Sequence, residues 1–219
     1  MESVKFHFDP RCPWCYQTSQ WVRRLEALGT IAVEWAVFSL EVVNAPEGTD
    51  PETLEAESGP ALRTAILIRQ NHGSKAMGRF YKAIGTRIWE QAPPQSDSVA
   101  VAREALAEIG LDPALVDQAL ADPATWTAVL AEHQSLLTTH HAFGVPTIVL
   151  DGGEGPAIFG PVISQMPDDE TAVKLWEHVT WLTRYENFAE LKRERIARPD
   201  LPAVAWRYAQ PPDGDGQPA

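Results

Sequence analysis

The chain has 219 residues, of which 44% are hydrophobic and 22% charged, so it can form one globular domain with a sizeable core. Its net charge of −12 repels phosphate backbones and anionic lipids, so nucleic acid and membrane surfaces are not expected partners. The first residues, MESVKFHFDP, lack the basic and apolar regions of a secretory signal. No later segment approaches the roughly eighteen uninterrupted apolar residues of a membrane span. We therefore expect a cytoplasmic protein.

The first forty residues predict a strand, a helix and a second strand. Residues 4–8 (VKFHF) alternate with period two, and Asp9-Pro10 ends this strand. A helix of about fourteen residues follows and stops at Gly29. Residues 31–40 alternate again and predict the second strand. This order favours a parallel pair of strands joined by a right-handed crossover.

The strand signals disappear over residues 45–142, where segments with helical periodicity follow one another. Ser96 or Ser98, Asp112 and Asp122 are the expected N-caps of these helices. We interpret residues 45–142 as an all-helical insertion.

Strand signals return at residues 146–150 and 156–160, with DGGEG between them as a hairpin turn. An amphipathic helix is predicted over residues 168–185 and a further helix over 186–196. The Pro/Gly-rich tail, residues 197–219, is expected to be loosely ordered.

The complete order of elements is βαβ, a helical insertion, then ββα. This is the order of a thioredoxin fold, an α/β fold, that is interrupted by a helical domain. Residues 1–44 and 143–196 would form the thioredoxin-like domain, with 45–142 inserted between them.

The only two cysteines, Cys12 and Cys15, form a CPWC motif where the first strand meets the first helix. Because cytoplasmic thiols are mostly reduced, this spacing indicates catalysis or metal binding rather than a structural disulfide. Pro13 suits the first helical turn, so the free amide groups of the helix start and the charge of Arg11 would lower the pKa of Cys12. Cys12 would then attack as a thiolate, and Cys15 would resolve the mixed disulfide.

GVPT, residues 144–147, lies directly before a predicted strand, and we expect a cis bond between Val145 and Pro146. A cis proline there would expose the backbone groups of Val145 to an extended disulfide or thiol beside the cysteines. Without the CPWC motif upstream, a trans proline at the first residue of a strand would be the simpler interpretation.

Five sequence blocks carry a resemblance to a known family: FDPRCPWCYQTSQW, HAFGVPTIV, IFGPVISQMP, KLWEHV and YENFAELKRER. Together and in this order they closely resemble the actinobacterial mycothiol-dependent reductases. These form a DsbA-like branch of the thioredoxin superfamily and include nitroreductases that activate nitro-aromatic prodrugs. The resemblance covers residues 4–196 and is weaker between 45 and 70. It implies a DsbA-like fold, reduction of disulfides or of electrophiles such as nitro-aromatics, and mycothiol as co-substrate, with no tightly bound cofactor.

By the same resemblance, Asn44 would hydrogen-bond a substrate. Trp14 would offer its aromatic face to a flat substrate or to the sugar of the thiol. Packing at the helix end explains Trp14 equally well, and a turn explains Asn44. Pro13, Val145 and Pro146 complete the expected substrate-binding set.

Other functions are compatible with the residues alone. A zinc site would need His7 or His140-His141 beside the cysteines, but adjacent histidines point in different directions, and we expect no metal. A thiol-dependent isomerase resembling the glutathione transferases does not need Cys15, so its presence argues against this class. A redox-sensing binding module would share the chemistry but turn over slowly.

Two carboxyl groups are candidates for proton transfer near Cys15. Asp9 comes just before the CPWC motif, and Glu34 lies in the second predicted strand. A turn residue and a solvated strand residue, respectively, explain them as well.

Overall fold

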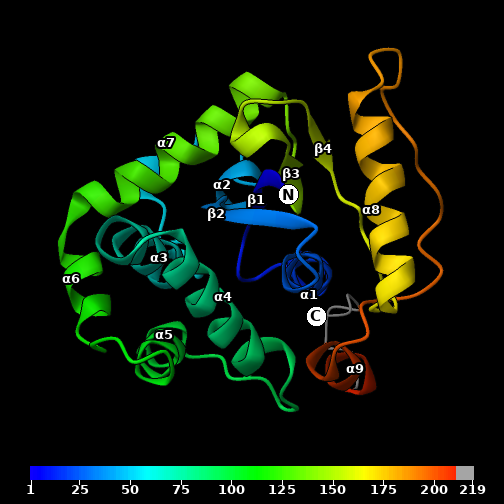
Figure 1. Cartoon of the computed structure of the whole chain (residues 1–219). Coiled ribbons are helices and arrows are strands. Elements are labelled where there is room, and N and C mark those ends of the chain that lie inside the picture. Colours follow the sequence, from blue (N-terminus) through cyan, green and yellow to red (C-terminus); the bar gives the residue numbers. More distant parts are fainter. Residues whose placement is uncertain (211–219) are drawn as a thin grey trace.

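The computed structural model describes residues 1–210, and its centre is a four-stranded mixed sheet (Figure 1). The strand order is β2-β1-β3-β4, with β1 parallel to β2 and antiparallel to β3, and with β3 antiparallel to β4. The strands are β1 (Glu2–Phe8), β2 (Ile31–Val37), β3 (Thr147–Val149) and β4 (Ala157–Phe159). They follow the chain order that the sequence predicts.

Burial of alternate side chains explains the position of β1 at the middle of the sheet. Val4, Phe6 and Phe8 are all at most 1% exposed. In the register of the strands, Phe6 lies beside Trp35 of β2 and Ile148 of β3. The Phe6 and Trp35 rings meet edge to face with 5.4 Å between their centroids, a favourable aromatic geometry. The carboxyl end of this buried strand carries the chain into the CPWC motif.

Helix α1 (Pro13–Ala27) starts within the CPWC motif and joins the two parallel strands. Gly29 follows the end of this helix with a φ of +72°, a conformation that costs an L-residue energy and glycine little. The Trp21 ring of α1 packs against Trp176 of α8 (Asp169–Arg184), with 5.9 Å between the ring centroids. The predicted helix, its glycine stop and the helix over residues 168–185 are therefore confirmed.

The helices between β2 and β3 form an arch beside the sheet, with α4 packed against β2 and α1 (Figure 1). Strands are absent from this part of the chain, as the sequence predicts. The helical elements are α2 (Leu40–Val43), a short 3-10 helix (Pro51–Thr53), α3 (Gly59–His72), α4 (Ser74–Trp89), α5 (Ser98–Glu108), α6 (Leu115–Ala121) and α7 (Pro123–His140).

The N-caps of these helices agree with the prediction in part. Asp122 caps α7, as predicted, and Asp112 accepts a backbone N–H in the turn before α6. Helix α5 is capped by Asp97, whose carboxylate accepts two backbone N–H groups, and not by Ser96 or Ser98. A carboxylate satisfies these donors and also interacts favourably with the helix dipole, which a hydroxyl does not.

Strands β3 and β4 form the predicted hairpin, and DGGEG supplies its turn. The turn contains a short 3-10 helix (Asp151–Gly153) in which Gly152 and Gly153 have positive φ. The guanidinium of Arg184 in α8 pairs with Asp151 at 2.8 Å, which joins the hairpin turn to the last long helix.

The C-terminal region differs from the prediction in two places. Residues 186–196 are not helical but run back along α8 (Figure 1), and Leu191 and Ile196 are almost fully exposed, so no apolar face is buried to stabilise a helix. Residues of the expected loose tail form α9 (Pro202–Ala209), where Ala203 and Val204 are buried and the helix packs near α4. Residues 211–219 of that tail lie outside the described residues. No helix within residues 1–210 has the length and apolarity to span a membrane.

Candidate active site

The two cysteines lie at the start of α1, and both are free thiols. Cys12 is the N-cap residue: its sulfur accepts the backbone N–H of Cys15 at 3.3 Å, and Pro13 occupies the first turn. Cys15 is fully buried, whereas Cys12 remains 6% exposed. An attacking reagent can therefore reach Cys12 far more easily than Cys15.

The surroundings shift the pKa values of the two thiols in opposite directions. A hydrogen bond from the Cys15 thiol lowers the pKa of Cys12, and the N–H groups of Cys15 and Trp14 add to this effect against burial and the charge of Asp9. Burial raises the pKa of Cys15 well above its usual value, and the neighbouring Cys12 raises it further. The site thus favours a thiolate on Cys12 and a proton on Cys15.

The backbone before β3 faces Cys12. The Cys12 sulfur lies 3.8 Å from the carbonyl oxygen of Val145, and the Val145-Pro146 peptide bond is cis. The Pro146 carbonyl accepts the N–H of Gly160 at 2.7 Å, so this segment is fixed to the strand beyond it. Cysteines and the GVPT segment, more than 130 residues apart, therefore meet as the sequence predicts.

Asp9, three residues before Cys12, is fully buried. Its carboxylate accepts the N–H of Arg11 at 2.8 Å and that of Leu40 at 2.7 Å, and burial raises its pKa to about 6. Asp9 therefore fixes the turn that carries Cys12, as expected of a turn residue, and it also titrates close to neutral pH. Glu34, the second carboxyl candidate, is exposed on β2.

Arg11 has a different partner from the one expected. Its guanidinium pairs with Glu57 at 2.5 Å, and both side chains are partly exposed. The Cys15 thiol and the amide groups of the helix start, rather than Arg11, account for the low pKa of Cys12.

The sequence model of the Rv2466c-like family, described as mycothiol-dependent nitroreductase Rv2466c, matches residues 11–193. The chain belongs to this family. Membership makes it an oxidoreductase, and the two free cysteines of the chain lie next to each other at the start of α1. The match includes both the CPWC motif and the GVPT segment.

Relatives and solved structures agree with this assignment. An uncharacterized protein of Mycobacterium tuberculosis, Rv2286c, is 38% identical over 197 residues, which cover 89% of this chain and 83% of the relative. The cytosolic disulfide reductase DsbM of Pseudomonas aeruginosa has a TM-score of 0.59 at 16% identity, over 82% of this chain and 99% of that one. A thioredoxin-like oxidoreductase of Silicibacter pomeroyi has a TM-score of 0.54 at 19% identity, over 82% and 87%. At these identities the structures show the fold alone, which is DsbA-like.

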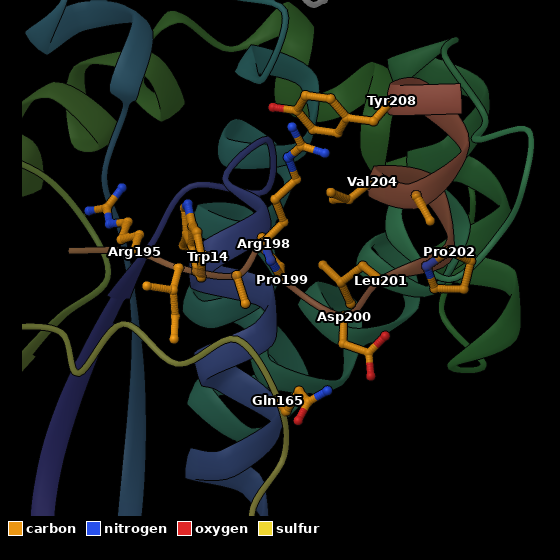
Figure 2. Close-up of a pocket in the computed structure, with 13 residues that line it drawn as sticks. Trp14, Gln165, Arg195, Arg198, Pro199, Asp200, Leu201, Pro202, Val204 and Tyr208 are labelled. Carbon is orange, nitrogen blue, oxygen red and sulfur yellow. The ribbon is translucent and has the colours of Figure 1, made fainter. Parts of the chain in front are cut away.

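The remaining members of the expected substrate-binding set lie in different surroundings. Trp14 is partly buried and lines a groove together with the C-terminal segment, where Arg195 stacks over its ring at 5.2 Å (Figure 2). Asn44 ends the short helix α2, and its amide donates to the carbonyl of Leu40 at 2.7 Å. This is the behaviour of a turn residue, and a role of Asn44 in substrate binding stays a prediction.

The histidines considered for a metal site have other surroundings. His7 is buried in β1, and burial lowers its pKa to about 3. His140 and His141 lie at the end of α7. Within the described part of the chain, no three side chains of the metal-binding types come close enough to hold an ion together.

Two contributors to the site have no local signal in the sequence. The indole N–H of Trp89, at the end of α4, donates to the carbonyl of Pro10 at 2.9 Å and supports the turn before Cys12. The hydroxyl of Tyr16, one residue after Cys15, donates to the carboxylate of Glu90.

Residues 195–208 border the groove beside Trp14. For these residues the basic run KRERIAR and Pro202, a residue suited to a first helical turn, are the signals that could have indicated an ordered segment.

Proposed function

We propose that the protein is a mycothiol-dependent reductase in which Cys12 is the nucleophile and Cys15 the resolving thiol. The observation that carries this proposal is the position of the Cys12 sulfur, which accepts the N–H of Cys15 while it faces the carbonyl of Val145. A thiolate held at a helix start beside the backbone carbonyl of Val145 is suited to attack an extended disulfide.

Reduction of a disulfide substrate would proceed in two exchanges. The Cys12 thiolate attacks one sulfur, the substrate S–S bond breaks, and the other sulfur leaves as a thiolate. Cys15 then loses its proton and attacks Cys12, which releases the second substrate thiolate and leaves a Cys12–Cys15 disulfide. The protein has lost two electrons and the substrate has gained them.

Two molecules of mycothiol would restore the dithiol. The first attacks the Cys12–Cys15 disulfide and forms a mixed disulfide on Cys12, the more accessible sulfur. The second attacks the mycothiol sulfur, so mycothiol disulfide leaves and both cysteines return to the reduced form. A nitro-aromatic would take the same two electrons with two protons and release water. Mycothiol belongs to the cytoplasmic thiol pool in this scheme, so we propose a cytoplasmic location.

Asp9 is suited to move the proton of Cys15 in this scheme. It is buried beside the motif with a pKa raised to about 6, so it can both accept and release a proton near neutral pH. The charge of Asp9 is among the causes that raise the pKa values of both thiols.

Reduction of the oxidised protein by mycothiol tests the proposal. Wild type is expected to regain two free thiols without accumulating an adduct. Cys15→Ser cannot form the internal disulfide, so it is treated with mycothiol disulfide in place of mycothiol. It is expected to retain one mycothiol on Cys12, visible by intact mass, because no Cys15 thiol is present to displace it. Cys12→Ser, with its remaining thiol buried, is the matched control and should carry no adduct. Absence of an adduct in every variant, together with oxidised wild type that mycothiol leaves unreduced, would remove mycothiol from the mechanism.

A further inference from the structure

A groove lies beside Trp14, the residue between the two cysteines of the motif. Its volume is about 740 Å³, within the range of sites for small molecules. The other wall is the segment that leads into α9, with Leu201 and Val204 as its buried base. Figure 2 shows Trp14 between Arg195 and Arg198 in this view. The groove therefore reaches from the motif to the C-terminal helix.

Each of the two arginines stacks on an aromatic ring. The guanidinium carbon of Arg195 lies 5.2 Å from the centre of the Trp14 ring, and that of Arg198 lies 3.3 Å from the centre of the Tyr208 ring. A stacked guanidinium uses its face and leaves its N–H edge free to bind a carboxylate or phosphate.

Neither arginine forms a salt bridge with a carboxylate among residues 1–210. Asp200 is the acidic residue of the groove wall, and its carboxylate points away from both guanidinium groups in Figure 2. Two free positive charges are unusual here, because the whole chain has 30 acidic against 18 basic residues. The local charge of the groove is thus opposite to that of the protein.

We propose that this groove binds the anionic group of an aromatic electrophile or disulfide and places its reactive atom at Cys12. The inference rests on the proposed function and adds a substrate class to it. Arg195 and Arg198 would attract the anionic substrate, and the N–H edge of one of them would bind its carboxylate. The Trp14 ring would stack on the aromatic part. For an aromatic disulfide, the Cys12 thiolate attacks the nearer sulfur and one aromatic thiolate leaves. Cys15 then loses its proton to Asp9, closes the Cys12–Cys15 disulfide and releases the second aromatic thiolate.

Two aromatic disulfides of different charge test the proposal directly. Pre-reduced protein is mixed at low ionic strength with dithiobis(nitrobenzoate), which carries two carboxylates, or with neutral dithiodipyridine, and the release of the aromatic thiolate is followed by absorbance. The ratio of the two rate constants removes the effect of any change in the cysteines themselves. Arg195→Gln combined with Arg198→Gln is expected to lower this ratio about tenfold, since loss of complementary charges slows association of a charged ligand.

Arg24→Gln combined with Arg103→Gln is the matched control, because it removes two positive charges outside the groove, where Arg24 pairs with Asp169 and Arg103 with Asp117. This variant should leave the ratio unchanged. An unchanged ratio in the double variant, or an equal fall in the control, would overturn the proposal and leave the reductase function intact. Failure of wild type to react with either disulfide would instead overturn the dithiol function on which the proposal rests.

Discussion

The indole N–H of Trp89 donates a 2.9 Å hydrogen bond to the carbonyl of Pro10, and this bond connects the end of α4 to the turn before Cys12. Trp89 is 3% exposed, so a water molecule could not easily take the place of its indole N–H as the donor to the Pro10 carbonyl. The helical arch between β2 and β3 is therefore part of the support of the active site. The geometry of the active site at the cysteines therefore depends on Trp89, which is 79 positions away from Pro10 in the chain.

Replacement of Trp89 by phenylalanine tests this support. Trp89→Phe keeps an aromatic ring but leaves the Pro10 carbonyl without its donor, which should cost about 1–2 kcal/mol of stability. Trp126→Phe is a matched control, because the indole of Trp126 donates to the carbonyl of Pro51 at the same 2.9 Å. We expect similar losses in urea unfolding for the two variants. Only Trp89→Phe should also change the alkylation rate of Cys12, and an equal change in the control would contradict the proposed support.

Close packing of α4 on α1 gives a second prediction. A Cβ atom on Gly85 would lie 1.9 Å from the ring of Tyr16, which is fully buried and cannot swing outward. Gly85→Ala should therefore destabilise the protein by about 1–3 kcal/mol through overpacking. Gly59→Ala is the control, since its nearest neighbour would be 3.9 Å away, and it should leave stability unchanged or raise it by up to about 1 kcal/mol. Thermal unfolding that ranks the two variants the other way would refute this packing.

The buried carboxyl of Asp9 predicts a particular pH dependence of stability. Burial raises its pKa from 3.8 to about 6, so between these values the folded protein holds a proton that the unfolded chain has released. The contribution of this group is fully present below the unfolded pKa and is lost as the pH rises through about 6. Asp9→Asn removes that contribution.

Urea unfolding of wild type and Asp9→Asn at matched pH values measures the effect. The free energy of unfolding of wild type, relative to that of the variant, should rise by about 2 kcal/mol as the pH falls from about 7.5 to about 4. Titration of all other groups largely cancels in this difference. Loss of the backbone hydrogen bonds of Asp9 changes the free energy of unfolding of the variant by a similar amount at every pH. It therefore does not alter the pH dependence of the difference. Parallel pH curves for the two proteins would show that Asp9 does not titrate in this range.

Much of the fold could be predicted because its local patterns agree with its tertiary contacts. Alternation around Phe6 and Phe8 predicts a buried central strand, and the glycine stop of α1 and the DGGEG turn follow from backbone conformations that glycine favours. The meeting of Cys12 with Val145 was likewise predictable, because the thioredoxin element order places both at the same end of the sheet.

The features that the sequence did not predict depend on contacts between residues that are far apart in the chain. Residues 186–196 have a helical pattern, yet the exposed side chains of Leu191 and Ile196 show that no apolar face is buried, so the segment forms no helix. Arg11 is next to Cys12 in the chain, but its guanidinium forms a salt bridge with Glu57, which lies between β2 and β3. The aromatic contact of Arg195 with Trp14 likewise joins residues from opposite ends of the chain.

The central claim is that Cys12 is the reactive thiolate and Cys15 its protonated partner. Alkylation rates measured against pH in Cys15→Ser and Cys12→Ser test it most directly, because each variant reports on one thiol and serine keeps a hydrogen-bond donor. We predict that Cys12 titrates below the ordinary thiol value of about 8.5, and that Cys15 titrates above it and reacts more slowly. A Cys12 midpoint at or above about 8.5, or faster alkylation of Cys15, would contradict the assignment.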